Sequence, residues 1–278
     1  MPNTLTGTPA AAAIYAQVRE RAALLAVRPC LAAVSVGAQP DDRAYLRSIA
    51  QAAAGCGVAV RPVPLPADCA PDTLTGTLRA LSADGAVHGV LLLRPLPEAL
   101  RAQEILDTLD ARKDVDGMTT ASLGALVTGA AGFAPCTAEA CKELLCAHGI
   151  DPAGRRVTVV GRSLVIGRPA ALLLTRADAT VTLCHRKTPD LAARCREADI
   201  LLAAAGAPGL ITTDFVRPEQ IVLDAGATAL PDGTLRGDVA PDAAAIAVCT
   251  PVPGGIGSVT TALLLRHTVQ AAENLRHF

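Results

Sequence analysis

The chain has 278 residues, of which 51% are hydrophobic, and its 26 acidic side chains nearly balance 25 Lys and Arg, for a formal charge of −1. This balance lacks the basic footprint of a protein that binds nucleic acid or an anionic membrane surface. The length is sufficient for two ordinary domains. We therefore expect small-molecule chemistry, without nucleic-acid or membrane partners.

The cysteines and the N-terminus bear on the compartment. Residues 1–27 lack the basic start and apolar core of a signal peptide, and no apolar run approaches the roughly 20 residues that cross a bilayer. Nine cysteines without a C-x-x-C pair favour reduced thiols in a cytoplasmic protein. Cys141, Cys146 and His148 cluster, but no second ligand pair follows at zinc-finger spacing. We expect helix packing there and no metal.

Short β-rich runs alternate with longer helical segments in the first half, which is typical of parallel α/β architecture. Strands are predicted at residues 30–37, 58–65 and 87–93. Helices are predicted at residues 9–26, 41–55 and 72–83. A Gly- and Thr-rich stretch beginning near residue 110 predicts loops and a short helix, followed by a helix at 138–148.

The second half restarts the alternation and predicts a Rossmann-like unit. Its strands are expected at residues 155–163, 179–185, 199–206, 220–226 and 245–252. The closing segment is helical and apolar on one face, and we expect it to pack back on the first domain. The sequence thus predicts a two-domain α/β fold, with one domain at 1–138 plus 258–278 and the other at 139–257.

A glycine turn follows the first strand of the second domain. Gly161 ends the strand and Gly167 lies near the start of the next helix, where absent side chains let a ligand approach the helix N-terminus. The turn departs from G-x-G-x-x-G, and any strand-to-helix unit needs a tight turn. Taken alone, it leaves nucleotide binding and a plain turn equally open.

The end of the next strand carries a basic cluster, His185, Arg186 and Lys187, without an acidic residue. NAD-selective Rossmann folds place an acid near this position to hold the ribose hydroxyls. Cations would instead form charge-assisted hydrogen bonds with a 2′-phosphate, which favours NADP over NAD. The alternative is a solvated basic turn.

Several strings identify a family when they are read together. They are "KDVDG" (113–117), "PCT" (135–137), "VVGRSLVIGRP" (159–169), "ATVTLCHRKT" (179–188), "GDV" (237–239) and "TPVPGGIGSVT" (250–260), with "VGAQPDDRAYLRS" and "GVLLLRPLP" in the first domain. In order and spacing they resemble the bifunctional methylenetetrahydrofolate dehydrogenase/methenyltetrahydrofolate cyclohydrolase family. The resemblance covers nearly the whole chain.

The resemblance implies an oxidoreductase of one-carbon metabolism. Members oxidise 5,10-methylenetetrahydrofolate to the methenyl form by hydride transfer to NADP or NAD, and commonly hydrolyse that product to formyltetrahydrofolate. They are usually homodimers. Residues 1–138 plus 258–278 would then form the folate-binding catalytic domain, and 139–257 the NAD(P)-binding domain.

The resemblance also assigns residues to the two ligands. Tyr45 matches the tyrosine that packs on the folate, and Asp116 the aspartate that hydrogen-bonds the pterin; both are the expected catalytic residues. An aspartate suits this role because its two oxygens accept two parallel donors, although beside a glycine it could be a plain turn former. Further substrate contacts are expected from Pro251, Gly254 and Gly255. The expected cofactor contacts, besides the basic cluster, are Gly161, Arg162, Ser163, Ile166, Gly167 and Pro169.

Four positions depart from the family pattern. Ile49 stands where the family has the lysine on which hydrolysis depends, and Leu93 where it has a glutamine. Asp42 and Ser258 replace a serine and a proline. Neither Ile nor Leu can donate, accept or ionise, so the groups that would manage protons on the attacking water are missing.

We therefore expect a dehydrogenase whose cyclohydrolase activity is weak or lost, because hydride transfer depends mainly on orientation. Arg47 and Arg94 are expected to point away from Ile49 and Leu93, and arginine is a poor proton shuttle. One alternative is a folate-binding paralogue that is non-catalytic or acts on a modified substrate. Another is a bifunctional enzyme that uses an unrecognised group, with Lys113 as the nearest candidate.

Overall fold

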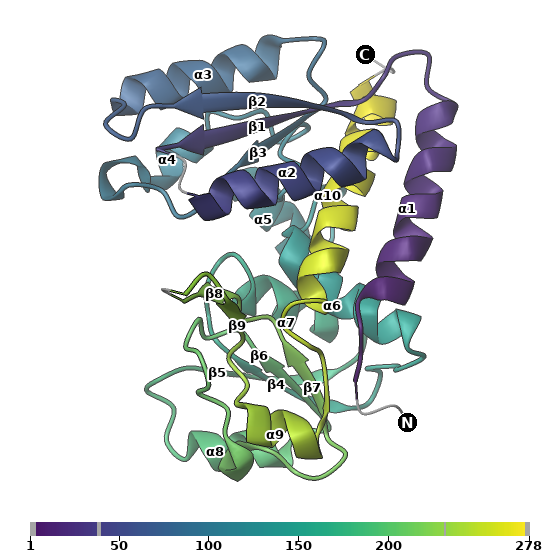
Figure 1. Ribbon diagram of the computed structural model, residues 1–278, viewed down its shortest axis with the longest axis vertical. Helices are drawn as coiled ribbons and strands as arrows, with labels where there is room; N and C mark the ends of the chain where they lie inside the picture. Colours follow the sequence, from purple (N-terminus) through teal and green to yellow (C-terminus); the bar gives the residue numbers. More distant parts are fainter. Residues whose placement is uncertain (1–3, 38–39, 231, 276–278) are drawn as a thin grey trace. The chain divides into compact units, whose positions relative to one another are not determined.

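The computed structural model describes residues 4–37, 40–230 and 232–275, which form two compact units (Figure 1). The N-terminal unit comprises Ala13–Cys136 and the chain from Thr261 onward, and the Rossmann-like unit comprises Thr137–Thr260 and the described residues up to Ala12. The domain division predicted above differs for the segment before Ala13. This segment joins the Rossmann-like unit because Leu5 N–H donates to Cys249 O at 2.9 Å.

The N-terminal unit is built on a small parallel sheet with strand order β2-β1-β3. The strands are β1 (Cys30–Val36), β2 (Ala59–Leu65) and β3 (Gly89–Leu92). The central strand β1 is a continuous apolar run that is fully buried at Leu31 to Val34, as expected for a parallel strand covered on both faces. Helices α2 (Pro40–Ala54) and α3 (Pro71–Ala83) lie on either side of this sheet (Figure 1).

Further helical elements belong to the described part of this unit. They are α1 (Thr8–Ala23), the 3₁₀ turn η1 (Glu98–Leu100), α4 (Gln103–Leu106), α5 (Thr120–Thr128) and α10 (Ile256–Asn274). Helix α5 is the predicted short helix, and it begins where Thr119 Oγ1 accepts the N–H of Ser122. Helix α10 returns to this unit as predicted, because His267 Nδ1 donates to Val115 O at 2.8 Å.

The Rossmann-like unit contains a five-stranded sheet with strand order β10-β7-β6-β4-β5, all pairs being parallel. The strands are β4 (Arg156–Val160), β5 (Thr180–Cys184), β6 (Ile200–Ala203), β7 (Ile221–Asp224) and β10 (Val248–Cys249). Around them lie α6 (Cys136–Ala147), α7 (Gly167–Thr175), α8 (Leu191–Glu197), α9 (Pro241–Ile246) and the 3₁₀ turn η2 (Thr213–Phe215). The predicted α/β class and Rossmann-like unit are confirmed.

Two details of the Rossmann-like unit differ from the prediction. Strand β10 covers two residues of the predicted 245–252, because α9 occupies the start of that range. A short antiparallel hairpin of β8 (Thr228–Ala229) and β9 (Leu235–Arg236) was not predicted. In the described part of the chain, no helix is both long and apolar enough to cross a membrane.

Candidate active site and cofactor loop

Tyr45 and Asp116 come together in the N-terminal unit, as the sequence predicts. Tyr45 projects from α2 and keeps 38% of its surface exposed, while its hydroxyl forms a side-chain hydrogen bond with Thr261 of α10. Burial of the hydroxyl raises the pKa of Tyr45, and the nearby charge of Asp116 raises it further. The phenol therefore stays neutral at physiological pH. It offers an accessible ring and a hydrogen-bonding group, but no base.

Asp116 owes its position to a tight turn against the start of α6. Gly117 adopts a φ of 64°, and a Cβ at this residue would lie 2.5 Å from Ala134 C. The turn brings Asp116 to Cys136, whose backbone and side chain both hydrogen-bond to the carboxylate. The "KDVDG" and "PCT" strings thus form one structural unit.

The Asp116 carboxyl group titrates unusually high for an aspartate. Burial raises the pKa of Asp116 to about 6, and the neighbouring Asp114 charge acts in the same direction. Arg94 and the hydrogen bonds from Cys136 oppose this shift. Asp116 can therefore change its protonation state close to the physiological range.

A small pocket lies beside Asp116 within the N-terminal unit. Its remaining lining residues are Val90, Leu92, Arg94, Leu106, Leu109, Asp114 and Met118. Asp114 is already committed to the fold, because its Oδ2 accepts Thr119 N–H and Ser122 Oγ–H, each at 2.7 Å. Arg94 and Asp116 are therefore the charged groups of this lining that are left to face a ligand.

Ile49 and Leu93, the two apolar replacements, are both buried. Ile49 on α2 is 0% exposed, and Leu93 is 7% exposed with its N–H donating to Val34 O. Neither residue lines the pocket beside Asp116, whereas Arg94 does; the strand alternation expected at Leu93 and Arg94 does not apply, because β3 ends at Leu92. Both positions are thus filled by hydrophobic core side chains.

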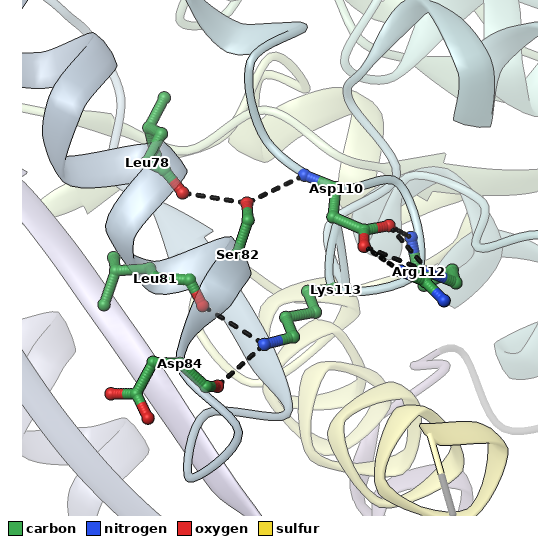
Figure 2. Close-up of polar contacts among 7 residues, drawn as sticks. All are labelled: Leu78, Leu81, Ser82, Asp84, Asp110, Arg112 and Lys113. Atoms are coloured by element: carbon green, nitrogen blue, oxygen red, sulfur yellow. Dashed lines mark hydrogen bonds and ion pairs between the residues drawn. The ribbon is translucent and has the colours of Figure 1, made fainter. Parts of the chain in front are cut away.

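Lys113, the nearest candidate for a substitute amine, is engaged elsewhere (Figure 2). Its Nζ donates to Asp84 O at 2.8 Å and to Leu81 O at 3.2 Å, and the residue is 4% exposed. Figure 2 shows the amine directed at the C-terminal end of α3, where backbone carbonyls lack helical partners. Lys113 is also the only lysine of the N-terminal unit, since Lys142 and Lys187 belong to the other unit.

The predicted cofactor loop is a close-packed turn between β4 and α7. Gly161 has a φ of 129°, and a Cβ there would lie 2.0 Å from Ala204 O. A Cβ at Gly167 would lie 2.0 Å from Gly161 O, so α7 begins in direct contact with the turn. Ser163 Oγ accepts Ile166 N–H at 3.1 Å and shapes the loop between the glycines. Arg162 and Ser163 are exposed, and Pro169 is buried in α7.

The basic cluster lies beside this loop. Gly161 N–H donates to Cys184 O at 2.9 Å, which joins the loop to the end of β5. Thr188 Oγ1 accepts His185 N–H at 2.9 Å and closes the turn that follows. Arg186 and Lys187 are exposed on this turn. The glycine loop and the two cations together suit the phosphates of a dinucleotide.

Two buried aspartates that sequence reasoning did not single out organise the adjacent loops. Asp238 is 0% exposed and accepts three backbone N–H groups of residues 205–207, at 2.6, 3.0 and 2.7 Å. Asp224 accepts the N–H groups of Gly226, Asp238 and Val239, each at 2.9 Å. Burial raises the pKa of Asp224. The "GDV" string contained this signal, because it includes Asp238.

The remaining predicted substrate residues form a tight turn in the Rossmann-like unit. Gly254 has a φ of 101°, and its carbonyl accepts Gly7 N–H at 2.8 Å. A Cβ at Gly255 would lie 2.6 Å from Pro251 O. Pro251, Gly254 and Gly255 therefore belong to one unit, and Tyr45 and Asp116 to the other.

In the cluster of Cys141, Cys146 and His148, Cys141 and His148 make contacts around α6 as expected, whereas Cys146 is exposed. Cys141 is buried and donates to Thr137 O, while His148 Nε2 donates to Thr6 O at 2.9 Å. Among residues 4–37, 40–230 and 232–275, no group of three His, Cys, Asp or Glu side chains could hold a metal ion.

Comparison with known proteins assigns the chain to a family. Residues 5–116 match the catalytic domain of tetrahydrofolate dehydrogenase/cyclohydrolase, and residues 135–276 match its NAD(P)-binding domain. The "Bifunctional protein FolD 1" of Paenarthrobacter aurescens is 46% identical over 275 residues, covering 96% of this chain and 93% of the relative. The protein of the same name from Rhodococcus jostii is 49% identical over 252 residues, covering 89% of this chain and 84% of the relative.

Solved structures agree with this assignment. The bifunctional FolD enzyme of Campylobacter jejuni superimposes with a TM-score of 0.92 at 36% identity, covering 98% of this chain and 99% of that one. The Trypanosoma brucei dehydrogenase-cyclohydrolase, solved with NADP and an inhibitor, superimposes with a TM-score of 0.92 at 34% identity, covering 99% of this chain and 98% of that one. The chain therefore belongs to the tetrahydrofolate dehydrogenase/cyclohydrolase family.

Proposed function

We propose that the protein oxidises 5,10-methylenetetrahydrofolate to 5,10-methenyltetrahydrofolate with NADP as hydride acceptor, and that it hydrolyses the product weakly or not at all. The observation that carries the second part is the placement of Lys113. This residue is the only lysine of the N-terminal unit, and its amine is bonded to the carbonyls of Leu81 and Asp84 at the end of α3, while Ile49 and Leu93 are buried and apolar. Family membership and the Tyr45–Asp116 pair support the first part.

The substrate side requires binding and orientation. The exposed ring of Tyr45 provides a flat surface for the folate, and the Asp116 carboxylate accepts the N–H groups of the pterin edge. Tyr45 cannot act as a base, because burial raises its pKa. Fixing the methylene carbon at reacting distance lowers the barrier to hydride transfer without an ionisable side chain.

The cofactor side uses the loop between β4 and α7. Gly161 and Gly167 allow the backbone to approach the pyrophosphate, and the N-terminus of α7 favours its negative charge. Arg186 and Lys187 hold the 2′-phosphate. When bound, NADP supplies the nicotinamide ring that accepts the hydride.

A second candidate is the full bifunctional activity, which is favoured by the names of the relatives compared above, since these are called bifunctional. The two candidates differ only in the fate of the methenyl product.

The dehydrogenase assignment is tested by NADPH formation from 5,10-methylenetetrahydrofolate. We expect turnover with NADP, and a rise of about tenfold or more in its KM when Arg186 and Lys187 are both changed to Ser, with the KM for NAD unchanged. An Arg176→Ser variant is a control, because this exposed arginine lies at the other end of α7. The assignment fails if neither nucleotide is reduced.

We also infer from the family resemblance that the protein is a cytoplasmic homodimer. Light scattering of the purified protein tests the oligomeric state, since a dimer has twice the mass of the 28.3 kDa chain. Fractionation of the source cells tests the location.

A further inference from the structure

Arg94 lies on the same wall of the pocket as two apolar residues of β3. Val90 and Leu92 of β3 line the pocket beside Asp116, and so does Arg94, which lies two residues beyond the end of the strand. Arg94 is exposed to solvent. Its long cationic side chain therefore contributes to a small pocket whose lining is mostly apolar.

Arg94 has no hydrogen-bond or ion-pair partner among the described residues. Two other arginines of this unit form ion pairs, Arg21 with Glu273 and Arg61 with Asp84. A guanidinium carries five N–H donors in a rigid fork. Arg94 thus presents unused donors at the pocket, within electrostatic range of Asp116 but outside ion-pair distance.

We propose that Arg94 is a substrate-contacting specificity residue that donates hydrogen bonds to the ring carbonyl oxygen of the pterin, while Asp116 accepts from the adjacent ring N–H and amino group. This assignment rests on the proposed function and adds a recognition group to it. The pterin edge carries two donors beside one acceptor. A carboxylate next to a guanidinium is the complementary pattern.

Charge balance favours a neutral ring over an anionic group as the partner of Arg94. Asp114 and Asp116 place two carboxylates on the pocket lining against the single cation of Arg94. An anion bound by Arg94 would therefore meet these acids, whereas a neutral heterocycle satisfies donor and acceptor together. The apolar side chains of Leu106, Leu109 and Met118 also suit a ring.

Binding of tetrahydrofolate without nucleotide tests the inference directly, because it requires no turnover. We expect Arg94→Leu to raise the Kd about tenfold and Arg94→Lys to recover part of the loss. Arg47→Leu is the matched control, because Arg47 is an exposed arginine of the neighbouring helix α2 that is not part of the pocket lining. An unchanged Kd in Arg94→Leu would overturn the inference.

A tetrahydropterin that lacks the glutamate tail identifies the group that Arg94 contacts. If Arg94 binds the ring, Arg94→Leu weakens tetrahydropterin and tetrahydrofolate by the same factor. A loss confined to tetrahydrofolate would mean that Arg94 binds the tail carboxylates, and it would overturn the ring assignment. Failure of the dehydrogenase assay leaves these binding results unaffected, so the two proposals fail separately.

The pH profile of tetrahydrofolate binding distinguishes the proposed role of Arg94 from a purely structural one, because a purely structural residue would leave this profile unchanged. The groups facing the Asp116 carboxyl are Asp114, Arg94, Cys136 and Tyr45. Arg94 is the cation among them and lowers the pKa of Asp116. Arg94→Leu is therefore expected to move the acidic limb of binding upward by up to about one pH unit. An unmoved limb would contradict direct coupling between Arg94 and Asp116.

Discussion

At the scale of single residues, the buried Asp116 carboxylate lowers the stability of the fold but suits the binding of a pterin. Burial raises its pKa to about 6, so the unfolded chain loses this proton at lower pH than the folded protein does. The ionised form therefore lowers the free energy of unfolding at neutral pH, and this penalty disappears as the pH falls below the ordinary aspartate value near 4. The same ionised form is the one that accepts two N–H groups from a pterin.

Replacing Asp116 with Asn separates these two effects. We expect Asp116→Asn to raise the free energy of unfolding at pH 8 by about 1 to 3 kcal/mol, with little change near pH 4, and to raise the KM for folate at least about tenfold. Denaturant unfolding at both pH values and steady-state kinetics provide the measurements. Asp68→Asn, at an exposed position, is the control for loss of one charge. A destabilised Asp116→Asn at pH 8 would contradict the burial of a charged carboxylate.

Lys113 is a structural residue that resembles a catalytic candidate only in sequence. Its amine satisfies two carbonyls at the end of α3, and burial lowers its pKa. We expect Lys113→Met to lower the free energy of unfolding by about 1 to 3 kcal/mol, because the buried Leu81 O loses its side-chain donor while Asp84 O keeps only the N–H of Val87, and we expect kcat for NADPH formation to be unchanged. Lys142→Met, at a half-buried position of α6, is the control for loss of a lysine. Full stability together with lost turnover would instead make Lys113 a catalytic group.

At the scale of elements, the contact between the turn after β4 and α7 determines the cofactor loop. A Cβ on Gly167 would lie 2.0 Å from Gly161 O, so Gly167→Ala must displace the helix or the turn. We expect a loss of about 2 kcal/mol or more in stability and a weaker affinity for NADP. Gly76→Ala is the matched control, since nothing lies within 4 Å of the added Cβ in α3 and alanine favours helix. Equal effects of the two substitutions would contradict the close packing.

The sequence predicted elements with a clear period and missed those without one. The strands around Val34 and Leu201 are continuous apolar runs, so the sequence alone predicts that they are buried. Helix α4 and the hairpin of β8 and β9 were missed, because each of these elements has four residues or fewer, too few to show a period; strand β10 was predicted, but longer than its two residues. Their positions depend on tertiary contacts, such as Ile211 N–H donating to Asp238 O beside the hairpin segment.

The candidate site was predictable only in part for a similar reason. Tyr45 and Asp116 stand in recognisable strings, and the structure brings them together. Asp238 and Arg94 gain their significance from neighbours distant in the sequence, namely the amides of residues 205–207 and the Asp116 pocket. Sequence spacing does not encode such contacts. The full burial of Ile49 could likewise not be predicted from the sequence, whereas its inability to ionise could.

At the scale of the whole molecule, the residues expected to bind folate are divided between the two compact units, whereas those expected to bind the nucleotide belong to one. Tyr45 and Asp116 belong to the N-terminal unit, and Pro251, Gly161 and Arg186 to the Rossmann-like unit. A ligand that binds the native state raises its apparent stability, so NADP alone and tetrahydrofolate alone should each raise the Tm. At a hundred times the Kd the gain is about 2.7 kcal/mol. A Tm that responds to neither ligand would exclude both the enzyme and the non-catalytic binding paralogue.

The central claim is that this protein can transfer the hydride but lacks the group that hydrolyses the product. The most direct test adds purified protein to 5,10-methenyltetrahydrofolate and follows the decay of its absorbance, with a bifunctional relative run in parallel to establish sensitivity. We expect the absorbance to decay at the rate of the buffer alone at every protein concentration. A decay rate that increases in proportion to the protein would contradict it.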